Sequence, residues 1–143
     1  MTRSFASTAR IAAAPDRVWA VLTDAGAWSS WDSGVDGVDG RLGAGETVTI
    51  RSKAAPGRAF PVKVATFEPP RTMVFDGGLP LGLFRGVRTY RLQPADGGTA
   101  TDFSMEEVYS GPLLGLMWRS MPDLGPSFQQ FATGLKTRVE TGG

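Results

Sequence analysis

The stretch RTYRLQPADGGTATDFSMEEVYS, residues 88–110, decides the fold of this chain. Two runs in which apolar and polar residues alternate flank the tetrapeptide ADGG at positions 95–98. An Asp-Gly pair between two such runs is a strong signal for a β-hairpin with a tight turn. The stretch therefore predicts two long antiparallel strands joined by a two-residue turn at Asp96 and Gly97.

The hairpin also places polar side chains on the face that its apolar residues mark as the inner one. With a two-residue turn, Arg88 lies opposite Met105 and diagonal to Glu107, and diagonal neighbours are within side-chain reach. Because a buried charge is costly unless it is paired, we expect an Arg88–Glu107 ion pair. It could anchor a ligand carbonyl, carboxylate or phenol, or it could be a rim pair near solvent. The residues that share this face are Arg88, Tyr90, Phe103, Met105, Glu107 and Tyr109.

Outward from the hairpin, shorter alternating runs predict further strands. These runs cover residues 3–12, 46–53, 60–68 and 71–76, and the hairpin strands extend over 84–94 and 98–110. Between the first two runs, the stretch SGVDGVDGRLGAGE, residues 33–46, contains five glycines and predicts turns.

The periodicity becomes helical towards the end of the chain. An apolar residue recurs every three or four positions at Leu124, Phe128, Phe131, Leu135 and Val139, which predicts a long amphipathic helix. A shorter helical piece is expected at 112–120, a helix from Pro15 to about Asp24, and a second helical turn at 27–31. Helices gathered on one face of an antiparallel sheet make an α+β domain.

Composition excludes several classes of function. The 143 residues suit one domain, and 15 Lys and Arg against 14 Asp and Glu give no basic footprint for nucleic acid. Histidine and cysteine are absent, and the aspartates at 24–39 lie among Gly and Ser as in turns, so we expect no metal and no cofactor. The sequence has neither a secretory signal nor an apolar run of about 18 residues. We therefore expect a cytoplasmic protein without stable membrane insertion.

Taken in order, several segments resemble the SRPBCC superfamily, which includes START-like and birch-pollen-allergen-like helix-grip proteins, and in particular its polyketide cyclase/dehydrase-like branch. They are APDRVWAVLTD, WSSWDSGV, GAGETVTI, FEPPRTMVF, YRLQPADGGTATDFSMEEVYSGPL and FATGLKTRVE. The resemblance implies that residues 1–143 form a single ligand-binding domain. In this domain a curved antiparallel sheet, with two short N-terminal helices, wraps around the long C-terminal helix. It also implies an apolar cavity between sheet and helix for lipids, polyketides or other hydrophobic molecules.

Three of the four tryptophans lie close together at positions 19, 28 and 31. Trp19 shares a helix face with Val18 and Leu22 and is expected in the core. Trp31 matches a recurrent aromatic of the resembled family and is either a structural plug or part of a cavity wall. Trp28 either lines the cavity or belongs to the core.

Two segments are apolar although they are rich in Gly and Pro, namely 77–86 and 110–118. Loops normally avoid so much apolar surface. In an antiparallel meander, the connections at 54–59, 77–84 and 110–112 fall at the same end of the sheet. We interpret this end as the mouth of the cavity, with a homodimer contact or a small satellite core as the alternatives.

The sequence therefore supports a carrier or sensor of a small hydrophobic molecule. The alternative is an enzyme similar to the polyketide aromatase/cyclases, in which Arg88, Tyr90, Glu107 and Tyr109 form the only plausible catalytic set. A third hypothesis is a subunit that contacts another protein through its apolar loops. The predicted ligand-binding residues are Trp28, Trp31, Phe75, Leu81, Phe84, Arg88, Tyr90, Phe103, Met105, Glu107, Tyr109, Met117 and Phe128.

Overall fold

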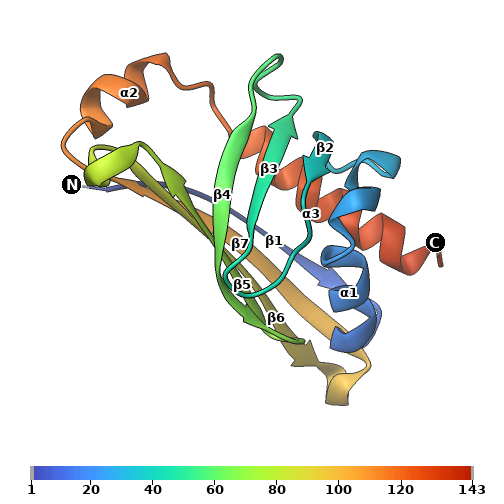
Figure 1. The fold of residues 1–143 in the computed structure, drawn as a ribbon. Coiled ribbons are helices and arrows are strands. Elements are labelled where there is room, and N and C mark those ends of the chain that lie inside the picture. Colours follow the sequence, from blue (N-terminus) through green and yellow to red (C-terminus); the bar gives the residue numbers. More distant parts are fainter. Residues whose placement is uncertain (1, 143) are drawn as a thin grey trace.

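The computed structural model describes residues 2–142 as an antiparallel sheet of seven strands curled around a C-terminal helix (Figure 1). The strands are β1 Arg3–Ile11, β2 Val35–Asp39, β3 Thr47–Ser52, β4 Phe60–Glu68, β5 Thr72–Gly78, β6 Arg85–Ala95 and β7 Ala100–Ser110, in the sheet order β1-β7-β6-β5-β4-β3-β2. The helices are α1 Pro15–Leu22, α2 Leu114–Ser120 and α3 Gly125–Glu140, with short 3-10 turns η1 Ala25–Ser30, η2 Pro80–Gly82 and η3 Asp96–Gly98. The α+β class and the helix-grip arrangement predicted from the sequence are confirmed.

The hairpin of β6 and β7 has a longer loop than the sequence predicted. Ala95 pairs with Ala100, so the loop has four residues, and Asp96 and the two following glycines have positive φ angles. As a result Arg88 lies directly opposite Glu107, and the predicted opposition to Met105 is wrong. Side chains alternate with a period of two, so a shift of two positions leaves each one on its predicted face.

The glycine-rich stretch holds a strand that the sequence did not predict. Strand β2 pairs with β3 at the sheet edge, and Val35 at its start is buried. Gly37 lies within this strand, where an added Cβ would collide with the Arg51 guanidinium. Because this contact is with the end of a flexible and exposed side chain, packing alone does not require glycine at this position.

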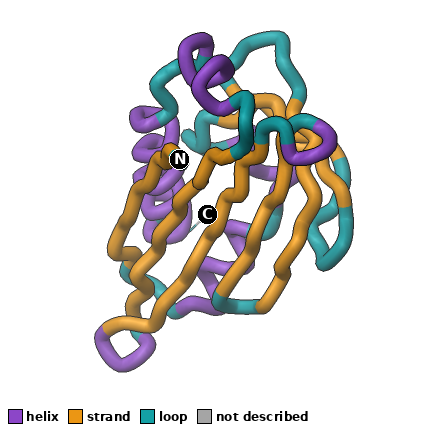
Figure 2. Tube along the Cα trace, turned by 90° about the vertical axis from the view of Figure 1, so that its left-hand side faces the viewer, coloured by secondary structure: helices purple, strands orange, loops and turns teal. Residues whose placement is uncertain are grey.

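Helix α3 lies in the concave face of the sheet and forms the centre of the core. The buried residues of its apolar stripe are Phe128, Phe131, Leu135 and Val139, as predicted, while Leu124 caps the helix and is half-buried. The Ser7 hydroxyl of β1 donates a hydrogen bond of 2.8 Å to the Phe128 carbonyl. Figure 2 shows the strands side by side, with α1 and α3 on one side of the sheet and α2 beyond its upper end.

The tryptophans near the N-terminus mostly serve this core. Trp19 contacts Phe67 with ring centroids 5.3 Å apart. Trp28 is 1% exposed, and its indole N–H donates to the Leu22 carbonyl at 2.9 Å. Trp31 packs against Phe131 of α3 at 5.2 Å, and the chain following it runs across that helix.

Gly134 permits this crossing, and its replacement tests the packing. A Cβ on Gly134 would overlap the Asp32 carbonyl and lie 3.2 Å from the Trp31 ring. We expect Gly134→Ala to lower the free energy of unfolding by about 1–3 kcal/mol through overpacking, despite the better helix propensity of alanine. Urea denaturation measures this difference.

The matched control is Gly115→Ala in α2, where nothing lies within 4 Å of the added methyl group. Its stability should be unchanged or higher by up to about 1 kcal/mol. A Gly134→Ala variant at least as stable as the original chain would mean that residues 31 and 32 do not cross α3 as described.

Candidate functional site

An ion pair lies on the inner face of the β6–β7 hairpin, opposite the first turn of α3. Arg88 Nε donates to Glu107 Oε1 at 2.6 Å, and the two side chains remain 22% and 15% exposed. The guanidinium also lies 4.7 Å above the ring of Phe128 and 3.5 Å from the Tyr90 hydroxyl. The pair is thus mostly surrounded by rings, yet solvent still reaches it.

A glycine makes room for the carboxylate of this pair. A Cβ at Gly86 would lie 2.8 Å from Glu107 Oε2 and 3.2 Å from the Tyr109 ring. An isolated glycine within a strand often marks such a close approach. Gly86 was not predicted as a site residue, although it lies two residues before Arg88 and so on the same face of the strand.

Burial and charge together set the protonation of the polar groups. Burial lowers the pKa of Arg88, but the Glu107 carboxylate and the Tyr90 phenol outweigh it, so the pKa is raised overall. Burial raises the pKa of Tyr90 against the influence of Arg88. Burial and the neighbouring Glu107 raise the pKa of Tyr109. Near neutral pH the guanidinium is charged and both phenols keep their protons, so these groups are available as hydrogen-bond donors.

Aromatic rings close the upper end of the cluster. Tyr109 stacks on Phe84 at 5.8 Å and meets the edges of Phe5 and Trp118 at about 6 Å. Trp118 in turn stacks on Phe5 at 5.3 Å, with Arg3 above its ring. Helix α2 therefore covers Tyr109 through Trp118. Phe5 and Trp118 were missed as site residues, although Phe5 alternates in β1 with the buried Ser7 and Ile11 on the same face.

The remaining predicted ligand-binding residues do not all lie at the Arg88–Glu107 pair. Phe75, Phe103 and Met105 are buried around Tyr90, and Trp28 contacts the same group of rings. Trp31 lies farther away, half-buried, and its buried indole N–H has no hydrogen-bond acceptor among the described residues. Met117 is half-buried on α2, whereas Leu81 is 96% exposed. Leu81 is thus not brought together with the Arg88–Glu107 cluster.

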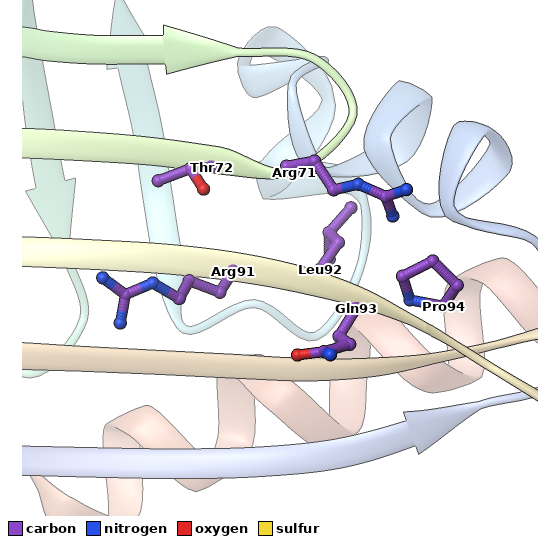
Figure 3. A pocket seen from close by; sticks show the side chains of 6 residues that line it. All are labelled: Arg71, Thr72, Arg91, Leu92, Gln93 and Pro94. Atoms are coloured by element: carbon purple, nitrogen blue, oxygen red, sulfur yellow. The ribbon is translucent and has the colours of Figure 1, made fainter.

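Side chains occupy the space between the sheet and α3. Trp28, Tyr90 and Phe103 each approach Phe131 with ring centroids between 5.0 and 6.3 Å apart. Two hollows lie on the outer side of the sheet, with volumes of about 430 and 540 Å³. Figure 3 shows the first, which is lined by Arg71, Thr72, Arg91, Leu92, Gln93 and Pro94. Neither hollow is lined by Arg88 or Glu107.

Within residues 2–142, no group of three acidic side chains could hold a metal ion. None of the helices in the same range is long and apolar enough to cross a membrane.

Comparison with known proteins agrees with this architecture. The family described as "Polyketide cyclase / dehydrase and lipid transport" matches residues 2–140. No curated protein matches the chain. Among solved structures, a protein of Mesorhizobium loti has a TM-score of 0.73 at 21% identity, over 99% of both chains.

Two further solved structures share the fold over nearly the whole chain. The Zhui aromatase/cyclase from a Streptomyces species has a TM-score of 0.74 at 16% identity, over 98% of this chain and 94% of that one. A START superfamily protein from Mycobacterium smegmatis has a TM-score of 0.70 at 14% identity, over 96% and 97%. At these identities the likeness is one of fold. With the family match over nearly its whole length, the chain belongs to the polyketide cyclase/dehydrase and lipid transport family.

Proposed function

We propose that this protein binds a small hydrophobic molecule between the inner face of the sheet, α2 and α3. The polar head of the ligand would lie against Arg88, Glu107 and Tyr109. The observation that carries the proposal is the ion pair, which is partly accessible in a setting of aromatic rings.

The contribution of the Arg88–Glu107 pair to folding stability does not by itself explain why the two charges are there. Two charges lose hydration when they are buried, and apolar residues of similar volume often serve the fold equally well or better. An apolar chamber discriminates poorly between ligands, however, and a few placed polar groups fix the orientation of a ligand. Recognition therefore accounts for Arg88 and Glu107 better than folding does.

Arg88, Glu107 and Tyr109 together favour a ligand whose polar head is uncharged. Glu107 already neutralises Arg88, so an anionic ligand would place a second carboxylate beside the first. Arg88 donates through Nε to Glu107 and through Nη1 to the Tyr90 hydroxyl, and the neighbouring Tyr109 keeps its proton. A carbonyl or phenol can accept from these donors without adding charge.

Entry requires that the upper end opens, because side chains fill the interior. Helix α2 buries only Leu114 fully, and Trp118 provides its aromatic contacts with Phe5 and Tyr109. The segment before α2 is tied to the loop at 79–84 through the Leu113 N–H and the Leu83 carbonyl, 2.9 Å apart. We infer that α2 and this loop form the gate.

A polyketide cyclase activity is the second candidate, since the Zhui aromatase/cyclase shares the fold. In such a reaction, Arg88 and the protonated tyrosines would stabilise a developing oxyanion, and Glu107 is the only base in the cluster. Native mass spectrometry of freshly purified protein, with organic extraction, separates the two candidates. A bound hydrophobic compound recovered unchanged supports carriage, and conversion of an added polyketide chain supports catalysis.

The ion pair should respond to single and double replacement in different ways. Arg88→Met or Glu107→Leu alone strands a charge and should lower the free energy of unfolding by about 2–4 kcal/mol, somewhat less than for a fully buried pair. The double variant should regain most of this loss. The matched control is the exposed pair Arg85–Asp76, where each single change should cost about 1 kcal/mol or less.

Ligand selectivity should not return with stability. Naphthalene, naphthol and naphthoate share one apolar body and differ in the head, and isothermal titration calorimetry compares their affinities. Wild-type protein should prefer naphthol to naphthalene by about tenfold or more, because a hydrogen bond to a charged group adds about 1.5–3 kcal/mol. Naphthoate should bind less well than naphthol. If the Arg88→Met/Glu107→Leu variant keeps the wild-type order, the pair takes no part in recognition.

Hydrogen exchange tests the gate. Backbone amides in 79–84 and 113–120 should exchange much faster than those in β7, because a gate opens without unfolding the sheet. Added naphthol should slow exchange in these two segments more than elsewhere. Equal protection of 79–84 and β7, with and without naphthol, would assign the loop to a closed core.

A further inference from the structure

Four of the five most exposed large apolar side chains in the described part of the chain are leucines on two connected segments at the upper end of the molecule, and the fifth is Phe60 at the start of β4. Leu81 is 96% exposed and Leu116 is 67% exposed, while Leu79 and Leu83 are each about 40% exposed. We call these four residues the leucine tip. Single exposed leucines are ordinary, but four on two connected segments are an apolar surface without a partner.

Leu81 also has an unfavourable backbone conformation. Its φ angle of 61° and ψ of 23° lie in the left-handed region, which glycine and asparagine adopt far more easily than leucine. A side chain in full solvent contributes nothing to the core that would offset this strain. Neither local conformation nor packing therefore explains leucine at this position.

The tip is held in place by hydrogen bonds. The Leu79 N–H donates to the Phe84 carbonyl at 2.8 Å, which closes the loop, and the Leu113 N–H donates to Leu83. Gly111 packs so closely that a Cβ there would lie 2.7 Å from the Leu83 carbonyl oxygen. The loop and the start of α2 thus form one connected support, and Figure 1 shows both at the same end of the sheet.

The charges near the tip are mainly basic. Arg119 is exposed on α2, Arg3 lies above Trp118 in the same helix, and Arg58 belongs to the β3–β4 loop at this end. None of the three forms an ion pair within residues 2–142. The nearby Asp76 is paired with Arg85, and Asp123 accepts the Gly125 N–H.

From this surface we propose that the leucine tip docks the protein on an anionic lipid bilayer. A projecting set of leucines needs a matching pocket on a protein partner, whereas the fluid interface of a bilayer accommodates any shape. Shallow apolar insertion and attraction of basic residues to anionic headgroups add to each other. The docking is a reversible surface contact, and it does not require that the chamber binds a ligand.

Vesicle flotation with the full chain tests the proposal. We expect binding to vesicles of phosphatidylcholine mixed with phosphatidylglycerol, weaker binding to pure phosphatidylcholine, and release by salt. Leu81→Asn should weaken vesicle binding by about tenfold. It should not lower the unfolding temperature, since asparagine suits the left-handed backbone.

The arginine variants test the electrostatic part of the docking. Arg119→Gln should weaken vesicle binding about fivefold, whereas the control Arg91→Gln, on the outer face of β6, should leave vesicle binding unchanged.

Three results would overturn the proposal. In the first, the wild-type protein binds neither kind of vesicle. In the second, Leu81→Asn binds vesicles as tightly as the wild type. In the third, Leu81 binds an acidic protein and the chain binds no vesicles. The naphthol titration without vesicles keeps the two proposals apart. The Arg88→Met/Glu107→Leu variant leaves the leucine tip intact and should bind vesicles like the original chain, and a protein that binds vesicles but not naphthol would contradict only the proposed function.

Discussion

The packing of α3 into the concave face of the sheet is the constraint on which the other features depend. Strands β6 and β7 have 11 residues each and extend about 36 Å. Helix α3 has 16 residues and extends only about 24 Å. One helix therefore cannot cover the whole inner face. The part beyond its first turn, where Arg88 and Glu107 lie, must be covered by something else, and α2 and the rings of Phe5, Phe84 and Trp118 do this.

The sequence predicted the faces of the strands better than their pairing. The hairpin loop is two residues longer than expected, because Gly98 and Thr99 continue the turn that Asp96 and Gly97 begin, and the Thr99 N–H donates to the Asp96 carbonyl. The inner face survived this error, since the side-chain period is two. Strand β2 was missed for a related reason. Glycine occurs both in turns and in strands, and the sequence alone does not distinguish the two. Pairing with a partner strand decides whether a glycine-rich segment becomes a strand.

The candidate site was partly accessible to sequence reasoning. The facing positions of one hairpin identify Arg88, Tyr90, Glu107 and Tyr109 by local rules. Trp118 reaches Tyr109 only because α2 folds back over the end of the sheet, which no local pattern encodes. Leu81 was expected to line the chamber because it is apolar and near the gate, but the left-handed backbone holds it in solvent.

Helix α2 connects the two proposals physically. Its Trp118 covers Tyr109 on the inside, while Leu116 and Arg119 of the same seven residues face outward. A surface that holds Leu116 and Arg119 shifts the gate only if it binds the open arrangement more tightly than the closed one. Moving Trp118 away from Tyr109 gives up ring contacts worth on the order of 1 kcal/mol each. Apolar insertion of one or two leucines is of the same order, so a bilayer that inserts one leucine more in the open arrangement than in the closed one would change the population of the open gate.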